Sequence, residues 1–136
     1  MGGLRITPLE IQRGDLRALL ADPRPVLVTF EAPGSAPCSL LAPRLRTVAQ
    51  EFGRRVLVVR VMDAGDASFA ARHHLLWIPT VAFWYGGREL MRLAGAAPIE
   101  ALRAHLRFML EEGPCPDTVE GPRRAVCSSF GRPAAH

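Results

Sequence analysis

Two short apolar runs, separated by one helical segment, constrain this chain more than any other feature. They lie at residues 26–30 (VLVTF) and 55–61 (RVLVVRV), and both are rich in β-branched residues. Such runs are typical of strands buried on both faces. Between them, residues 36–52 repeat apolar side chains at helical spacing, and Gly53 follows as a stop signal. Strand, helix and strand form a βαβ unit, so the sequence predicts a parallel pair at the centre of an α/β sheet.

The rest of the chain adds an antiparallel pair of strands and a last helix. Residues 80–84 and 88–94 read as strands, and two glycines at 86–87 supply the positive backbone angles of a tight hairpin. Pro98 opens a helix whose apolar stripe ends before Gly113. We therefore expect an α/β fold in which helices flank a central mixed sheet of four to five strands.

The N-terminal segment leaves the number of strands open. Residues 7–10 (TPLE) fit a helix capping box, with threonine as the cap and glutamate reaching back to it. Leu9 and Ile11 also alternate with polar neighbours, which equally fits a short edge strand before a helix at 15–21. The sheet has five strands only if the second alternative is right.

Length and composition indicate one folded domain and a tail. The chain has 136 residues, of which 49% are hydrophobic and 22% charged, and this supports one domain with a real core. We assign residues 1–113 to the domain and residues 114–136, rich in proline and glycine, to a C-terminal tail. The chain has neither a bilayer-spanning apolar run nor an apolar leader, so we expect a cytoplasmic protein without a membrane partner.

The charge and histidine patterns argue against two classes of function. All 17 basic residues are arginines spread along the chain, and the formal net charge is +4. Nucleic-acid binding requires a basic stripe or a recognisable module, so we expect no nucleic-acid partner. His73 and His74 would point about 100° apart on a helix, which makes a poor chelating pair. The cysteines lack zinc-type spacing, so we expect no metal and no cofactor.

The strongest chemical signal lies at residues 31–45 (EAPGSAPCSLLAPRL). This stretch places Cys38 directly after Pro37 in the first turn of the predicted helix, with Ser35 three residues earlier. Unpaired N–H groups and the helix dipole stabilise a thiolate in a first turn. Serine has no thiolate-like form near neutral pH, and as a helix cap it contributes about 1 kcal/mol. Whether Cys38 is reactive or inert stays open at this point.

Two further cysteines, Cys115 and Cys127, follow the last predicted helix. A flexible tail would hold their thiols at high effective concentration near the domain, so both are candidate resolving thiols for Cys38. A bridge from Cys127 to Cys38 or to Cys115 is left open. For a cytosolic protein we expect Cys115 and Cys127 to be reduced and exposed.

The order of elements and several local matches resemble the thioredoxin family across residues 9–112. The matches are VLVTFEAPGSAPCSLLAP at 26–43, WIPT at 77–80, and Gly87 and Gly95 before the last helix. The resemblance implies a thioredoxin-like fold and a role in thiol-disulfide exchange. These expectations come from the matched motifs rather than from composition or periodicity.

The resemblance also assigns places in the family's active site. Pro37 and Cys38 match the last two residues of its Cys-Gly-Pro-Cys motif. Pro79 matches the family's cis proline next to the active cysteines, which implies a cis bond between Ile78 and Pro79. Because only about 5 to 6% of X–Pro bonds in folded proteins are cis, this is a demanding prediction.

This chain departs from the family pattern at the residues that carry the chemistry. Ser35 replaces the attacking cysteine, Ala36 replaces the glycine, and Gly34 replaces the tryptophan before the motif. Thr29 replaces a buried aspartate that similar enzymes use to move a proton, and Glu31 stands where a second tryptophan is usual. We therefore expect a degenerate site with one remaining cysteine.

Two hypotheses follow. In the first, Cys38 exchanges with protein thiols and disulfides or with glutathione, or senses oxidant, and classical disulfide reductase activity is weak or absent. In the second, the groove beside Pro79 is a redox-silent module that binds a peptide or protein. The predicted catalytic residues are Cys38, Ser35, Pro37 and Pro79, and the predicted contact residues are Gly34, Ala36, Trp77 and Ile78. For Trp77, simple core packing is an open alternative.

Overall fold

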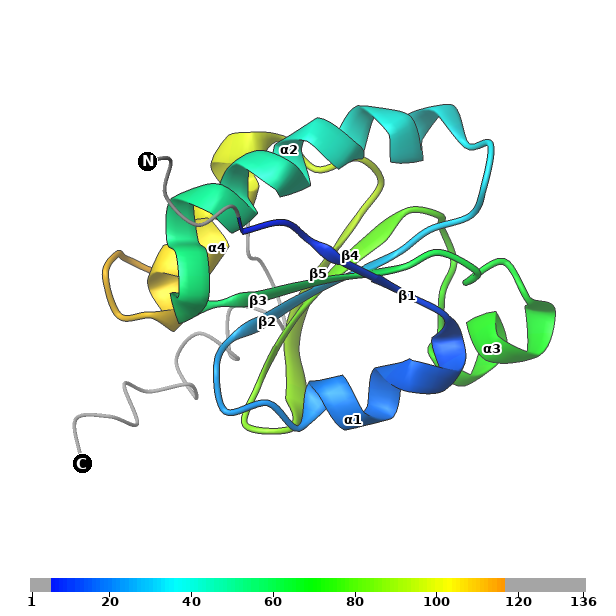
Figure 1. Ribbon diagram of the computed structural model, residues 1–136, viewed down its shortest axis with the longest axis horizontal. Coiled ribbons are helices and arrows are strands. Elements are labelled where there is room, and N and C mark those ends of the chain that lie inside the picture. Colours follow the sequence, from blue (N-terminus) through cyan, green and yellow to red (C-terminus); the bar gives the residue numbers. More distant parts are fainter. Residues whose placement is uncertain (1–5, 117–136) are drawn as a thin grey trace.

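In the computed structural model, which describes residues 6–116, one mixed sheet lies between two pairs of helices (Figure 1). The strands are β1 (Leu9–Ile11), β2 (Val26–Phe30), β3 (Leu57–Val61), β4 (Thr80–Tyr85) and β5 (Arg88–Ala94). The helices are α1 (Leu16–Leu20), α2 (Ala36–Phe52), α3 (Ala67–Arg72) and α4 (Ile99–Met109). Short 3-10 turns, Arg13–Asp15 and Gly53–Arg55, precede α1 and follow α2.

The sheet has the strand order β1-β3-β2-β4-β5. β3 pairs in parallel with both β1 and β2, whereas β4 pairs antiparallel with both β2 and β5. The hairpin between β4 and β5 turns at Gly86 and Gly87, whose φ angles are 65° and 81°. The predicted α/β architecture with a mixed sheet flanked by helices is therefore confirmed.

The edge-strand alternative is right for the N-terminal segment, and the capping box at residues 7–10 is wrong. Leu9, Glu10 and Ile11 lie in register with Val59, Arg60 and Val61 of β3. The backbone of this segment bonds to the sheet, so it cannot also form a helical turn. The fifth strand brings the Glu10 side chain to Arg60, with consequences for the site.

The two faces of the sheet carry separate apolar cores (Figure 1). α2 and α4 cover one face, and the buried residues of α2 include the predicted stripe Leu41, Leu45, Val48 and Phe52. α1 and α3 cover the other face, where Phe30 of β2 packs near Phe69 of α3. Because side chains alternate along a strand, β2 contributes to both cores.

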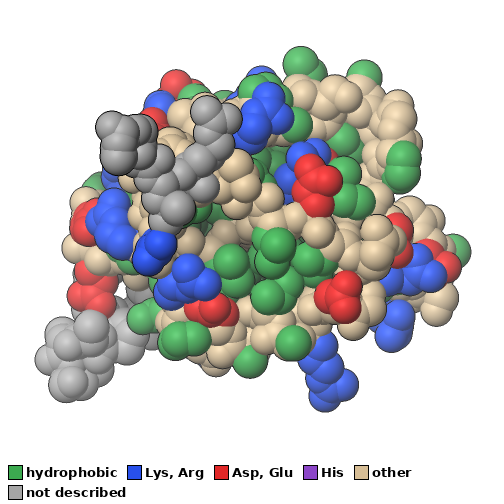
Figure 2. Space-filling view, viewed as in Figure 1, with side chains coloured by type: hydrophobic (Ala, Val, Ile, Leu, Met, Phe, Trp, Pro, Cys, Tyr) green, Lys and Arg blue, Asp and Glu red, His purple; other side chains and the backbone are tan. Residues whose placement is uncertain are grey.

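Charges of both signs are interspersed on the face shown in Figure 2. Arginines pair with nearby carboxylates, as in Arg13 with Asp63, Arg55 with Glu112 and Arg103 with Glu51. No helix within residues 6–116 is long and apolar enough to cross a membrane. The cytoplasmic location and the boundary at residue 113 stay predictions, because the tail beyond Pro116 lies outside the described residues.

Candidate active site

The mouth of the site is the start of α2. Gly34 has a φ of 79°, a left-handed conformation that glycine adopts readily, and it turns the chain into the helix. Ser35 is the N-cap, and its Oγ accepts a hydrogen bond from the Cys38 N–H at 3.4 Å. The interpretation of Ser35 as a helix cap is confirmed.

Cys38 is the third residue of α2 and a free cysteine. Its side chain is buried, with 6% of the residue exposed, whereas Ala36 and Pro37 are exposed and Ser35 is half-buried. Cys38 is therefore mostly screened from solvent, although the two residues before it in the first turn are open to it. The structure brings the predicted residues Ser35, Ala36, Pro37 and Cys38 together in one cap and first turn.

The Ile78–Pro79 bond is cis, as the resemblance implies. Thr80, the next residue, lies in register with Phe30 at the end of β2. The chain then runs from Phe30 through residues 31–35 into α2, so Pro79 and the helix start adjoin the same end of β2. Pro79 is fixed on its far side because its carbonyl accepts from Gly95 N–H at 2.8 Å.

Exposed apolar side chains lie before the cis proline. Leu76 is 86% exposed and Trp77 is 65% exposed. The core-packing alternative for Trp77 is therefore wrong, and the Trp77 ring is available for contact. We call Gly34, Leu76 and Trp77 the rim. Ile78 is half-buried against the core beneath α1 and α3.

A buried polar cluster, which we call the floor, consists of Thr29, Glu31 and Arg60. The Glu31 carboxylate accepts two hydrogen bonds from Arg60, Nε to Oε2 and Nη2 to Oε1, both at 2.8 Å. Thr29 Oγ1 donates to Glu31 Oε2 at 2.5 Å. Glu31 and Thr29 are fully buried, and Arg60 is 8% exposed. Arg60 Nη1 also donates to Glu10 Oε2 at 3.1 Å.

Strand register places the floor under α2. Thr29 and Arg60 are register partners in the parallel pair of β2 and β3. Leu27 and Val58, two residues before each, belong to the core beneath α2 and α4. Side chains two residues apart share a face, so Thr29 and Arg60 face α2. The floor thus lies on the side of the sheet that carries Cys38.

Electrostatics connect the floor with the thiol. The side-chain hydrogen bonds to Glu31 raise the pKa of Arg60 above its usual value. Burial alone would lower this pKa, but its effect is the smaller one. The charges of Glu31, Glu10 and the Cys38 thiolate raise it further. Arg60 and Cys38 therefore lie within electrostatic reach of one another.

The floor changes one expectation and was otherwise not predicted. The threonine at position 29 suggested that the site lacks a buried acid, yet Glu31 supplies a carboxylate that is hydrogen-bonded to Thr29. Two signals were present in the sequence. Arg60 interrupts an otherwise apolar strand, and Glu31 directly follows a fully buried one. A charge inside such a run requires a partner of opposite sign.

Cys115 does not lie near Cys38. Arg55 and Glu112 form an ion pair at 2.6 Å, which places the segment before Cys115 at the C-terminal end of α2. Cys38 lies in the first turn, and a helix of 17 residues is about 25 Å long. The expectation of a reduced Cys115 is wrong, since Cys115 is disulfide-bonded. Cys127, the other candidate resolving thiol, lies outside the described residues.

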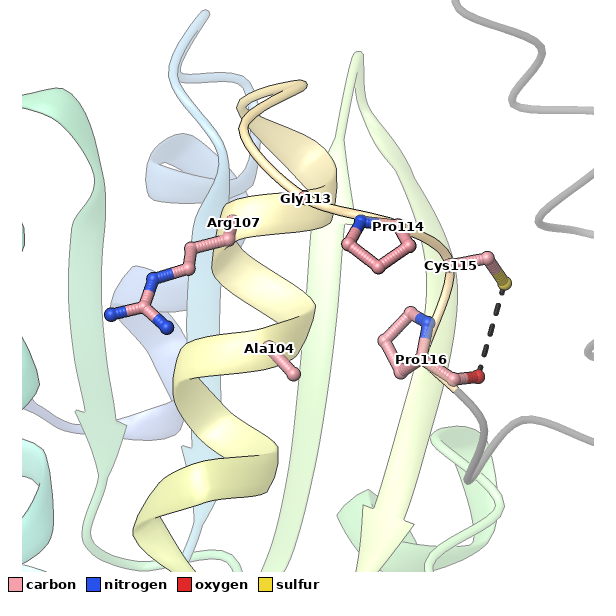
Figure 3. A pocket seen from close by; sticks show the side chains of 6 residues that line it. All are labelled: Ala104, Arg107, Gly113, Pro114, Cys115 and Pro116. Atoms are coloured by element: carbon pink, nitrogen blue, oxygen red, sulfur yellow. Dashed lines mark hydrogen bonds between the residues drawn. The ribbon is translucent and has the colours of Figure 1, made fainter.

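A hollow of about 300 Å³ occurs beside Cys115 (Figure 3). Its lining includes Arg107 of α4 and the two prolines that flank Cys115. The Cys115 sulfur lies 3.9 Å from the Pro116 carbonyl oxygen, the dashed contact in Figure 3. A disulfide sulfur carries no proton, so we interpret this approach as a contact rather than a hydrogen bond. Within residues 6–116, histidine, cysteine and acidic side chains form no group that could hold a metal ion.

Comparison with known proteins identifies the family. The thioredoxin family model matches residues 9–108, most of the chain. The chain belongs to the thioredoxin family. Thioredoxin 1 of Chlorobaculum tepidum is 35% identical over 79 residues, which are 58% of this chain and 78% of that protein. The thioredoxin of Synechocystis sp. is 32% identical over 86 residues, which are 63% of this chain and 80% of that protein.

Solved thioredoxin structures share the fold. The thioredoxin of Trypanosoma brucei brucei superposes with a TM-score of 0.69 at 21% identity and covers 82% of this chain and 97% of its own. For the thioredoxin of Fasciola hepatica, the TM-score is 0.65, the identity 26%, and the coverage 74% and 98%. Membership of the family gives this thioredoxin-family chain a general function in thiol-disulfide redox chemistry, with protein disulfides as the general substrate class.

Proposed function

We propose that this thioredoxin-family protein acts as a monothiol, through Cys38 alone, on protein or glutathione disulfides. The observation that carries the proposal is the geometry at the start of α2. A free cysteine occupies the first turn, and a serine occupies the N-cap where the family has its attacking cysteine. Membership of the family favours this function over a redox-silent binding module.

The exchange step balances without a cofactor. The Cys38 thiolate attacks one sulfur of a disulfide, the old sulfur–sulfur bond breaks, and a mixed disulfide with Cys38 forms. The displaced thiolate leaves and takes a proton from water. An external thiol of the glutathione class then attacks the substrate sulfur of the mixed disulfide, forms a disulfide with that sulfur and displaces the Cys38 thiolate. Cys38 is reduced before and after the cycle, and the external thiol supplies the electrons.

Ser35 is the reason why we expect classical reductase activity to be weak or absent. In a dithiol site, an internal thiol completes the exchange at an effective molarity that a solution thiol cannot match. Ser35 has a hydroxyl group and cannot supply this second thiol. Cys115 cannot supply it either, because it lies at the other end of α2 and is disulfide-bonded. Release of the mixed disulfide therefore depends on a second molecule, and the mixed disulfide accumulates when thiol is scarce.

The rim supplies the contacts for a protein or peptide disulfide. The exposed Leu76 and Trp77 side chains precede the cis proline, and the space where a side chain on Gly34 would begin is open. An apolar ring of this exposure favours contact with extended peptides over small charged solutes. We expect the bound peptide to lie beside Pro79 and to contact Ala36 and Ile78.

The test is to treat the full-length protein with glutathione disulfide and to measure the intact mass and the Cys38 peptide. We expect one glutathionyl adduct on Cys38, which a later excess of glutathione removes. The Cys38→Ala variant should carry no adduct at that peptide. Folded protein that gains no adduct on Cys38 would contradict the proposal.

A companion assay measures reduction of insulin disulfides with dithiothreitol as the reductant. We expect the natural protein to turn over near the uncatalysed rate. Ser35→Cys restores the dithiol spacing on an intact scaffold, so turnover should rise at least about tenfold, because the second step becomes intramolecular. Rapid reduction by the natural protein that Cys38→Ala abolishes would show that Ser35 does not limit the chemistry.

A further inference from the structure

The carboxylate in the floor, Glu31, is not placed to accept a proton from Cys38. Both Glu31 oxygens are occupied, Oε1 by Arg60 and Oε2 by Arg60 and Thr29. A proton on Glu31 would remove the negative charge that strengthens these hydrogen bonds, and charge-assisted hydrogen bonds are the stronger class. Glu31 is therefore a counter-charge to Arg60 and not the base of the site.

The charges that face one another here come from three elements. Arg60 lies on β3, Glu10 on the edge strand β1, and Glu31 follows β2. Cys38 approaches from α2 and is the thiol whose charge affects Arg60. A buried cation next to a thiol favours the thiolate, and a carboxylate paired with that cation removes most of the effect.

We infer that Glu31 is a positioning residue, which holds the Arg60 guanidinium under α2 and balances its charge, so that Arg60 activates Cys38 only when this pair is opened. This inference rests on the proposed function at Cys38 and adds its regulation. The Glu31–Arg60 pair thereby limits the reactivity of Cys38. A partner or a change that draws Glu31 or Glu10 away from Arg60 would make Cys38 more nucleophilic.

The experiment measures the rate of Cys38 alkylation by iodoacetamide between pH 6 and 9, followed on the Cys38 peptide by mass spectrometry. We expect Glu31→Gln, which keeps the shape and removes the charge, to raise the rate at pH 7 at least about threefold and to move the pH midpoint downward. Arg60→Gln should lower the rate and move the midpoint upward. The double variant should return close to the natural protein.

These opposite signs separate an electrostatic role from a structural one. Loosening of the helix start would expose Cys38 and speed alkylation in each variant, with no change of midpoint. Thr29→Val is the matched control, because it removes one hydrogen bond to Glu31 and no charge. Its midpoint should stay in place. Equal midpoints for Glu31→Gln, Arg60→Gln and the natural protein would overturn the inference.

A second variant protects the test if Glu31→Gln does not fold. Glu10 is 62% exposed in its side chain and also pairs with Arg60, so Glu10→Gln should fold. We expect a smaller acceleration of the same sign, and a folded Glu10→Gln with an unchanged midpoint would contradict the inference. Alkylation needs no disulfide partner. If Cys38 gains no glutathione adduct but the midpoints shift as predicted, the proposed function is rejected and the inference about Glu31 and Arg60 stands.

Discussion

The rim and the floor of the site differ in how they are built, although both adjoin the same end of β2. In the rim, Leu76 and Trp77 project into solvent with little packing of their own. In the floor, Glu31 and Arg60 are buried and joined by two hydrogen bonds. Changes in the rim should therefore affect recognition, whereas changes in the floor should affect stability and the reactivity of Cys38.

The floor should give the largest effect on stability. Arg60→Gln leaves the Glu31 carboxylate buried without its cation, and removal of one partner from a buried pair costs about 3–5 kcal/mol. Urea unfolding measures the loss. Replacing both residues, as in Glu31→Met with Arg60→Met, should recover most of it, because an apolar pair leaves no buried charge. If Arg60→Gln lowers the free energy of unfolding by less than about 1 kcal/mol, water replaces Arg60 as the partner of the Glu31 carboxylate and the prediction is wrong.

The rim should give the largest effect on recognition. Trp77→Ala should slow mixed-disulfide formation between Cys38 and a peptide disulfide about tenfold, because an exposed aromatic anchor is typical of the residues that dominate binding. The free energy of unfolding should change by less than about 0.5 kcal/mol. Leu9→Ala, an exposed apolar residue on β1, is the matched control and should change neither. A stability loss above about 2 kcal/mol would place Trp77 with the packed residues instead.

Between the two regions lies the cap, with an intermediate effect. Ser35→Ala removes the acceptor for the Cys38 N–H and should cost about 1 kcal/mol of unfolding free energy. Ser35→Asn keeps a capping side chain and should lose much less. If both variants lose the same amount, the cap does not stabilise α2.

The smallest expected effect is on the pH dependence of stability, and it comes from His73, which lies just before Leu76 and Trp77 in the chain. Its ring packs on Phe69 and Phe30 at centroid distances of 4.4 and 5.6 Å. Burial, followed by the charges of Arg72 and Arg92, holds the pKa of His73 below its usual value. The unfolded chain therefore binds the proton first, so this contribution is present above about pH 6.5 and is lost as pH falls through the lowered pKa.

Between pH 7 and pH 5.5, His73→Phe should therefore lose less stability than the natural protein. The difference should be about 0.5 kcal/mol or less, because the partly exposed ring is screened by solvent. Unfolding free energies measured across this range check the sign. A steeper decline in His73→Phe would contradict it.

Much of the fold is predictable because its signals are local. The apolar run at 26–30 and the stripe of α2 specify burial by their periods, and α2 begins and ends at the predicted residues. Ser35 specifies the helix start because its side chain bonds a backbone group three residues on. The start of β3 was less accurate, since residues 55 and 56 of the predicted strand lie outside it, whereas its end at residue 61 agrees.

The N-terminal segment shows where local signals fail. A capping box and an edge strand use the same residues, and only the pairing of Leu9 to Ile11 with β3 decides between them. Trp77 is similar, since an aromatic residue before a strand fits a core position as well as a surface one. Its exposure depends on the path of the chain into the cis proline.

The sequence by itself determined the central βαβ unit, the hairpin, the last helix, the cap at Ser35 and the position of one cysteine in the first turn of α2, because these depend on side-chain period and on contacts a few residues apart. Only the tertiary structure decided that Glu31 and Arg60 form one buried pair beneath that cysteine. The two residues are 29 positions apart, and parallel register between strands brings them together. The same long-range packing leaves the rim exposed and separates Cys115 from Cys38 by the length of a helix.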